Sequence, residues 1–290
     1  MKFHLIYDSS NTSNFQGNKV SGLLQSACAT HNIECVLYDV QQLDLFELPA
    51  LGHTDLLYRA AIAGKAVEAQ RRMISSECTS FHADWEMVFN GESSSYFLHA
   101  AHELPAIPSF SGIPQTENEI LQCVEQLGPF PLIVKVTGNS LGVGVMRVDS
   151  IESLRSVLDY LKSLKVDVLI RKYIDHDYYV RAIVVGDQVV ASHAAYAMSG
   201  DFRTNTGDDT HQKREARVLT PEQQVMVVES VRVLGVETGG VDLLFDTDDN
   251  PFIAEVNFPN NFSVTQGVTG IDIASKMVQY LMKKAQTKLD

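Results

Sequence analysis

Two carboxylates and an amide lie on two neighbouring apolar segments near the end of the chain. Asp242 is in the segment 241–245, and Glu255 and Asn257 follow the polar turn 246–250. Side chains alternate across a strand, so Glu255 and Asn257 point to one face, which Asp242 can join if the strands pair. Such hard oxygen donors suit Mg²⁺, which shares its octahedral coordination with phosphates and water. The alternative is that both acids face solvent on an amphipathic hairpin, but an E-x-N pair on an otherwise apolar strand favours the metal site.

A lysine followed by a glycine-rich turn forms a second group. Lys135 is near the end of an apolar strand, and Gly138, Gly142 and Gly144 follow before the next strand. Backbone N–H groups of such a turn can approach an anion closely because glycine has no Cβ, and the lysine adds a positive charge. The pattern differs from a Walker P-loop, in which the lysine follows the last glycine. A glycine-rich hairpin with a surface lysine is the alternative interpretation.

A third group consists of Arg203 and Asn205, in the long polar segment 198–217, and Arg181 in the apolar segment before it. Arginine can bind a phosphate or a carboxylate through two parallel hydrogen bonds. Long irregular segments in compact domains are often lids or binding loops. This group therefore indicates a second anion contact.

The pattern of apolar residues predicts the elements that position these groups. Short apolar runs at 3–7, 35–38 and 56–58 alternate with helical patterns that begin near Val20 and at Ala66, which predicts a small βαβ-type domain with a parallel sheet. The proline-containing stretch 105–114 is the candidate linker, after a helix at 93–103. Further strands are expected at 132–136, 143–148, 167–173, 178–185, 188–195, 240–245 and 251–256, and further helices at 151–164, 220–234 and 271–284.

Composition limits the function. Lys plus Arg is 23 and Asp plus Glu is 36, so the net charge of −13 disfavours general binding to nucleic acid or to an anionic membrane. Four scattered cysteines without C-x-x-C spacing favour reduced thiols over disulfides or a zinc site. Since no run approaches the roughly 20 apolar residues of a membrane helix, we expect a soluble, cytoplasmic protein.

Taken in order, these groups closely resemble the ATP-grasp superfamily and, within it, the RimK-like peptide and amino-acid ligases. The matching segments across residues 131–284 are VKVTGNSLGVGV, VLIRKYI, VRAIVVGDQVV, GDFRTN, GVDLL, AEVN and TGIDIA. The resemblance implies an α/β fold of the α+β ATP-grasp type. It places an N-terminal βαβ-type domain at 1–92, a linker helix and central subdomain with the glycine hairpin at 93–175, and a C-terminal subdomain with the metal site at 176–290.

The resemblance also implies a reaction and its ligands. ATP would lie between the last two subdomains with Mg²⁺, usually two ions, for which Mn²⁺ can substitute. The enzyme would convert a small-molecule or peptide carboxylate to an acyl phosphate and pass it to an amine. The implied phosphate contacts are Lys135 and the hairpin 138–144 with Ser140, and the implied adenine contacts are Lys172 and Tyr173. The implied reaction-centre residues are Arg203 and Asn205. The implied metal ligands are Asp242, Glu255 and Asn257.

The nucleoside end departs from the family pattern. Tyr179, close to Arg181, stands where the family usually has a ribose-binding carboxylate, and Lys172 reverses the charge of the hinge glutamate. An arginine pair expected after the strand 188–195 is replaced by Ala195 and Tyr196. These changes keep two alternatives open: a catalytically silent nucleotide-binding module, and an enzyme whose acyl phosphate cyclises or is not passed to an amine. A homo-oligomer would match the habit of relatives.

Overall fold

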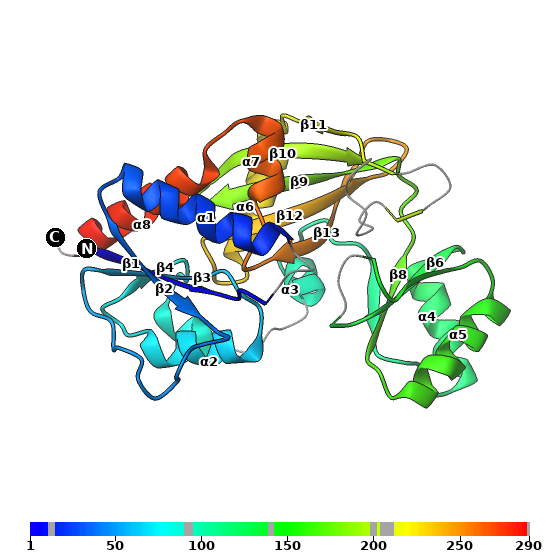
Figure 1. Ribbon diagram of the computed structural model, residues 1–290. Coiled ribbons are helices and arrows are strands. Elements are labelled where there is room, and N and C mark those ends of the chain that lie inside the picture. Colours follow the sequence, from blue (N-terminus) through cyan, green and yellow to red (C-terminus); the bar gives the residue numbers. More distant parts are fainter. Residues whose placement is uncertain (11–14, 90–94, 139–141, 198–201, 204–211, 289–290) are drawn as a thin grey trace.

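The computed structural model describes residues 1–10, 15–89, 95–138, 142–197, 202–203 and 212–288 (Figure 1). Three sheets organise this part of the chain, with strand orders β2-β1-β3-β4, β5-β8-β6-β7 and β11-β10-β9-β12-β13. We refer to them as the N-terminal, central and C-terminal sheets. The first is parallel and the other two are antiparallel, which confirms the predicted α/β class.

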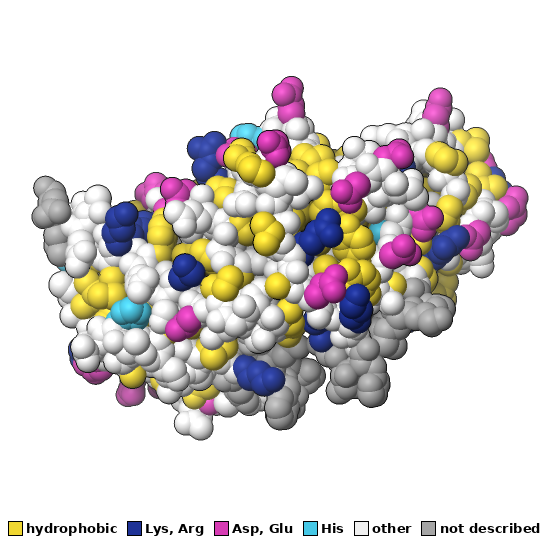
Figure 2. All heavy atoms as spheres, turned by 90° about the horizontal axis from the view of Figure 1, so that it is seen from above, with side chains coloured by type: hydrophobic (Ala, Val, Ile, Leu, Met, Phe, Trp, Pro, Cys, Tyr) yellow, Lys and Arg dark blue, Asp and Glu magenta, His cyan; other side chains and the backbone are white. Residues whose placement is uncertain are grey.

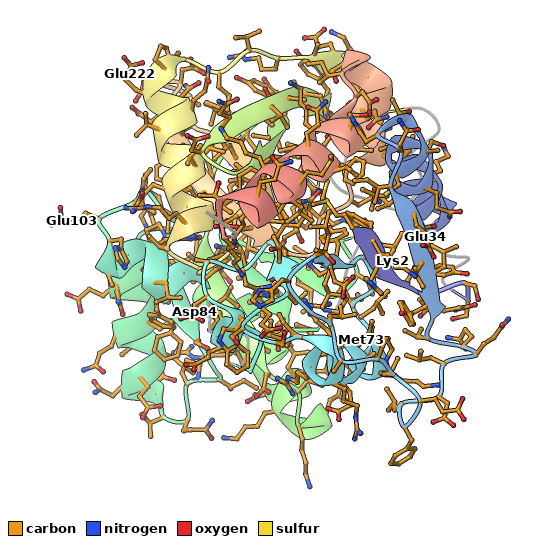
Figure 3. The ribbon with its side chains drawn as sticks, turned by 90° about the vertical axis from the view of Figure 1, so that its left-hand side faces the viewer. Lys2, Glu34, Met73, Asp84, Glu103 and Glu222 are labelled. Atoms are coloured by element: carbon orange, nitrogen blue, oxygen red, sulfur yellow. The ribbon has the colours of Figure 1, made fainter. Side chains whose placement is uncertain are left out.

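The N-terminal sheet contains the three predicted strands and one short additional strand. Its strands are β1 (Lys2–Tyr7), β2 (Glu34–Asp39), β3 (Asp55–Arg59) and β4 (Thr79–Ser80), with α1 (Phe15–Thr30) and α2 (Gly64–Met73) between them. Buried side chains alternate along β1, so Phe3 and Leu5 pack on the α1 side and Ile6 packs on the α2 side. Lys2 and Glu34 lie side by side on neighbouring strands (Figure 3), with Lys2 Nζ 3.3 Å from Glu34 Oε2. Helix α1 begins earlier than the apolar pattern near Val20 indicates.

The central sheet has its own core and lies at the opposite end of the molecule from α2 (Figure 1). It consists of β5 (Ser109–Ser111), β6 (Leu132–Val136), β7 (Val145–Val148) and β8 (Val168–Lys172), covered by α4 (Glu117–Leu127) and α5 (Ile151–Leu164). The predicted linker at 105–114 contains β5, which pairs with β8. Helix α4 is an element that the sequence analysis missed, although Thr116 caps it by accepting from the backbone N–H of Glu119.

The C-terminal sheet has helices on both faces. Its strands are β9 (Tyr178–Val185), β10 (Gln188–Tyr196), β11 (Arg214–Ala216), β12 (Thr238–Phe245) and β13 (Pro251–Asn257), and its helices are α6 (Pro221–Arg232), α7 (Ser263–Thr269) and α8 (Ile273–Thr287). Thr220 caps α6 with Pro221 in its first turn, as predicted. Val180 and Ala182 pack on the α6 side, whereas Ile183 packs with α8 on the other side. Strand β11 and helix α7 were not predicted.

The N-terminal and C-terminal sheets share one hydrophobic core. Helix α8 packs beside α1 and contributes Met277 and Leu281 to the cluster that holds Phe3. Lys284 on α8 donates to the carbonyls of Ser80 (3.1 Å) and His82 (2.8 Å) and to the Glu237 carboxylate. The short helices η1 (Trp85–Phe89) and α3 (Ser95–Ala101) follow β4 along the chain. These contacts fix the two sheets together, whereas the central sheet keeps a separate core.

Two further observations bear on the expected setting of the protein. The four cysteines are free thiols, of which Cys28, Cys78 and Cys123 are buried. In the described residues, no helix is both long and apolar enough to cross a membrane. Acidic and basic side chains are interspersed on the face seen in Figure 2.

Candidate active site

Strands β12 and β13 bring the predicted oxygen donors onto one face of the C-terminal sheet. Asp242 is the cross-strand partner of Glu255, and Gly240 is the partner of Asn257. The Asp242 side chain is 12% exposed, whereas the Glu255 side chain is 46% exposed. The alternative in which both acids face solvent is therefore wrong for Asp242. The shared face that alternation predicted is present in the structure.

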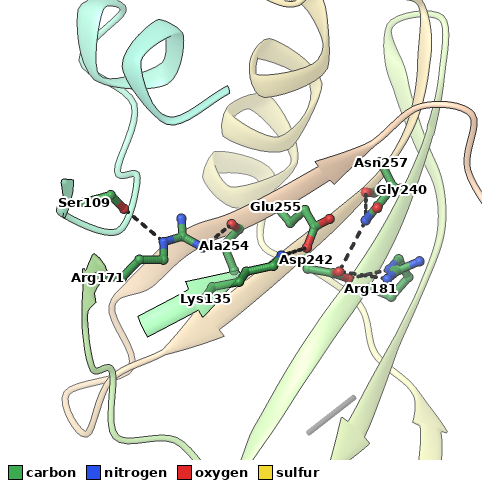
Figure 4. Close-up of polar contacts among 9 residues, drawn as sticks. All are labelled: Ser109, Lys135, Arg171, Arg181, Gly240, Asp242, Ala254, Glu255 and Asn257. Carbon is green, nitrogen blue, oxygen red and sulfur yellow. Dashed lines mark hydrogen bonds and ion pairs between the residues drawn. The ribbon is translucent and has the colours of Figure 1, made fainter. Parts of the chain in front are cut away.

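Arg181 on β9 holds Asp242 in place. The two residues are cross-strand partners, and the guanidinium donates to both carboxylate oxygens, with Nη2–Oδ2 at 2.7 Å (Figure 4). Asn257 Nδ2 lies 3.4 Å from the same Oδ2. Burial raises the pKa of Asp242, and Arg181 opposes that rise. The bidentate geometry is that of an ion pair, and the Asp242 charge raises the pKa of Arg181 although burial acts against it.

Glycine at position 240 leaves room for this ion pair. A Cβ there would lie 3.3 Å from Arg181 Cδ and 3.2 Å from the Cβ of Asn260. A larger residue would therefore displace the arginine that positions Asp242.

Lys135 connects this face to the central sheet. It lies on β6, and its Nζ is 3.2 Å from Glu255 Oε2 (Figure 4). The lysine and the carboxylate are 120 residues apart in sequence, and they meet because β6 faces β13 across the junction of the two sheets. The structure thus brings the predicted phosphate-binding cation to the predicted metal ligands.

The glycine-rich turn joins β6 to β7, as predicted. Gly138, Gly142 and Gly144 have φ values of 81°, 72° and 76°, which favour glycine over residues with a side chain. Arg203 Nη1 lies 3.4 Å from the carbonyl oxygen of Gly142, so this arginine reaches the turn. Ser140 and Asn205, two predicted site residues, lie outside the described residues.

Comparison with known proteins agrees with this geometry. A model of the RimK-like ATP-grasp domain matches residues 95–281. The chain belongs to this family. The bS6–L-glutamate ligase of Escherichia coli O81 (strain ED1a) is 31% identical over 182 residues, which are 61% of this chain and 59% of that protein. A probable alpha-L-glutamate ligase of Ectopseudomonas mendocina is 31% identical over 61% of this chain and 58% of that protein. The chain thus spans about three fifths of the length of these relatives.

The fold of solved ATP-grasp ligases extends over nearly the whole chain. The ligase PsnB complexed with its minimal precursor covers 98% of this chain and 100% of its own, with a TM-score of 0.73 and 14% identity. Another PsnB structure holds Mg and ADP. At this identity the likeness establishes the fold, which is the ATP-grasp fold with three sheets.

The predicted adenine contacts, Lys172 and Tyr173, lie at the end of β8 and directly after it. Lys172 is exposed there, and Tyr173 is half-buried beneath Arg147, whose guanidinium carbon is 4.8 Å from the ring centre. Burial, followed by the nearby Asp175 charge, raises the pKa of Tyr173. Tyr179, in contrast, is buried on β9 on the same side as Arg181, and its ring and that of His193 form a T-shaped pair with centres 6.4 Å apart. The two tyrosines therefore have different surroundings.

Arg171 is a site residue that the sequence analysis missed. Its Nε donates to Ser109 Oγ and its Nη1 donates to the carbonyl of Ala254, both at 2.9 Å (Figure 4). Burial lowers the pKa of Arg171 to about 10, although Glu255 acts in the opposite direction. The arginine joins β5, β8 and β13 directly beside Glu255. An arginine within the apolar strand VLIRKYI was the available signal.

The predicted metal-ligand set mixes carboxylates with an amide. Among the described residues, no group of three or more His, Cys, Asp or Glu side chains could hold a metal ion. Asp242, Glu255 and Asn257 thus offer two carboxylates and one amide, a set that leaves coordination positions for phosphate oxygens and water.

Proposed function

We propose that the chain is an ATP-dependent ligase that joins a carboxylate to an amine through an acyl phosphate. The observation that carries the proposal is the approach of Lys135 to Glu255, directly beside Asp242 and Asn257. A phosphate-binding cation and a set of hard oxygen donors meet at the junction of two sheets, in a chain of the RimK-like ATP-grasp family. The glutamate ligases among its relatives support the same chemistry.

Mg²⁺ fits the donors at this junction. Asp242, Glu255 and Asn257 are the residues that would hold the metal together with ATP. The site would take one or two ions, for which Mn²⁺ would substitute. Burial disfavours the charge of Asp242 in the protein alone, and a divalent cation would offset that cost. When bound, the metal supplies neutralisation of charge on the transferring phosphoryl group.

The chain's own residues position the reactants. When ATP binds, Lys135 leaves the Glu255 carboxylate and contacts a nucleotide phosphate instead. Arg181 keeps the Asp242 carboxylate oriented. We assign the glycine turn with Ser140 to the phosphates, Arg203 and Asn205 to the reaction centre, and Lys172, Tyr173 and Tyr179 to the nucleoside. Contact between Arg203 and the carbonyl of Gly142 supports the first two assignments, because it places the arginine at the turn.

The reaction has two steps. A substrate carboxylate oxygen attacks the γ-phosphorus of ATP, the bond to the β-phosphate oxygen breaks, and ADP leaves. The amine nitrogen then attacks the acyl carbon, inorganic phosphate departs, and the nitrogen loses a proton as the amide forms. Both steps depend on positioning and charge neutralisation more than on a protein nucleophile.

The substrates are an amino acid, a peptide or a small metabolite, and glutamate is the first amino acid to test because of the named relatives. We propose the division into 1–92, 93–175 and 176–290, with the nucleotide between the last two parts. The free thiols support a cytoplasmic setting. Nucleic acid is not a proposed partner, and a homo-oligomer is compatible with the proposal.

A phosphate-release screen tests the proposal. The protein is incubated with Mg–ATP and with pooled amino acids, glutamate and dipeptides, and ADP and phosphate are measured. Substrate-dependent release that disappears in Glu255→Ala is expected, and hydroxylamine should trap the acyl phosphate. Release that persists unchanged in Glu255→Ala would refute the assignment. ATP binding without turnover would instead support the silent nucleotide-binding module, and the mass of the product separates amide formation from cyclisation.

A further inference from the structure

One buried nitrogen near the candidate active site has no hydrogen-bond partner among the described residues. His193 on β10 is 2% exposed, and its Nδ1 lies 3.0 Å from Thr265 Oγ1 on α7. The other ring nitrogen, Nε2, is buried and unpaired. Buried polar groups in native proteins nearly always have partners, so an unpaired one requires an explanation.

The position of His193 places it on the ligand side of the C-terminal sheet. It is the cross-strand partner of Arg181, which is in turn the partner of Asp242. Cross-strand partners project to the same face, so the row from Glu255 through Asp242 and Arg181 continues to His193. Two strand spacings, about 10 Å, separate β12 from β10. A small substrate whose reacting group is at the metal end would therefore need to span about this distance to contact His193.

The surroundings of His193 favour a neutral ring in a positive field. Burial lowers the pKa of His193 to about 4, and the charges of Arg181 and Arg214 add to this effect. His193 has a second cross-strand partner, Ala216 on β11, and Arg214 lies two residues before it on the same strand. When the Thr265 hydroxyl donates to Nδ1, Nε2 carries the hydrogen and becomes a donor. A neutral N–H donor in the field of two guanidinium groups matches an anionic oxygen.

We propose that His193 Nε2 donates to a carboxylate oxygen of the amino-acid substrate, in the electrostatic field of Arg181 and Arg214. The proposal rests on the ligase function, because an amino acid that supplies the amine keeps its own carboxylates unreacted and available for recognition. Arg181 then has two tasks, since it orients Asp242 and contributes charge to the carboxylate subsite. His193 is a substrate-binding residue that determines specificity and takes no part in phosphoryl transfer.

Direct binding of glutamate tests the subsite without turnover. Isothermal titration measures L-glutamate, glutamine and isoglutamine binding to the protein with Mg–ADP present, for the wild type and His193→Leu. A hydrogen bond to a charged group is lost in the variant, so glutamate should bind about 10–100-fold more weakly. Glutamine lacks the side-chain carboxylate and isoglutamine lacks the α-carboxylate. The one of these two amides that lacks the carboxylate recognised by His193 should bind both proteins equally. His102→Leu, at an exposed position, is the matched control.

The outcomes separate the subsite from the proposed function. Equal glutamate affinity in wild type and His193→Leu, equal weakening of all three ligands, or no glutamate binding to the wild type would overturn the subsite. Glutamate binding that depends on His193, together with no phosphate release, would leave the subsite standing and count against the ligase. Thermal unfolding verifies that His193→Leu is folded, and Arg214→Gln, which should also weaken glutamate selectively, provides a second variant if it is not.

Discussion

Replacement of Glu255 by glutamine separates its proposed metal role from its structural role. The Lys135–Glu255 ion pair spans 3.2 Å, with side chains that are 27% and 46% exposed. Ion pairs this accessible to solvent contribute about 0–1 kcal/mol to folding. We therefore expect Glu255→Gln to lower the melting temperature by no more than about 4 °C. The substitution keeps the shape of the side chain and removes only its charge.

The effect on catalysis should be much larger. A bound metal supplies several kcal/mol of charge stabilisation to a transition state, and each 1.36 kcal/mol is a factor of ten in rate. Substrate-dependent phosphate release by Glu255→Gln should thus fall by at least about 100-fold. Glu125→Gln, on the exposed surface of α4, is the matched control and should retain wild-type activity.

Two results would refute this reasoning. Phosphate release within threefold of the wild type would remove Glu255 from the metal site. A loss of stability of about 3 kcal/mol or more in denaturant unfolding would mean that the ion pair is a structural requirement, contrary to its exposure. Thermal shift by Mg–ATP gives an independent measure, because the variant should lose the metal-dependent part of the shift.

Three further predictions concern buried charges. Asp242→Asn should destabilise the protein by about 3–5 kcal/mol in urea unfolding because it leaves Arg181 buried without a counter-charge. The double change Arg181→Met/Asp242→Leu should recover part of this loss, and additive losses would contradict the reasoning. Burial, followed by the nearby cations, lowers the pKa of His82 to about 4. Between about pH 6.5 and 4 the unfolded state therefore binds a proton that the native state does not, and the free energy of unfolding should fall by about 1 kcal/mol per pH unit on acidification. An equally steep slope in His82→Asn would exclude His82 as the source. Lys284→Met should cost about 3 kcal/mol in the same unfolding assay because Glu237 then lacks its partner. Glu237→Gln in that background should recover the part of the loss that comes from the unpaired charge, and no recovery would contradict this reasoning.

The long apolar strands and the metal face could be predicted from sequence alone. Two-residue alternation places Glu255 and Asn257 on one face whatever the tertiary structure, and a short hairpin then leaves few registers for Asp242. Thr220 with Pro221 predicted the start of α6 for a similarly local reason. These features depend on neighbours within a few residues.

The features that were missed depend on distant parts of the chain. Strand β5 is three residues long and exists because β8 offers a free edge, so a proline-containing segment around it was interpreted as a linker. Arg171 becomes part of the site only when β13 brings the carbonyl of Ala254 to it. The unpaired nitrogen of His193 depends on the packing of α7 against β10, where Thr265 pairs with the other ring nitrogen. No local pattern carries that information.

The packing of α8 against the N-terminal sheet has a consequence for synthesis on the ribosome. Helix α8 lies beside α1 and fills the core that also holds Phe3 (Figure 1). Helix α1 covers part of that face of the sheet soon after synthesis, whereas the part that packs on α8 stays uncovered until the residues of α8 emerge. The central sheet has a separate core and needs no such delay. The central sheet can thus complete its core before the N-terminal sheet completes its own.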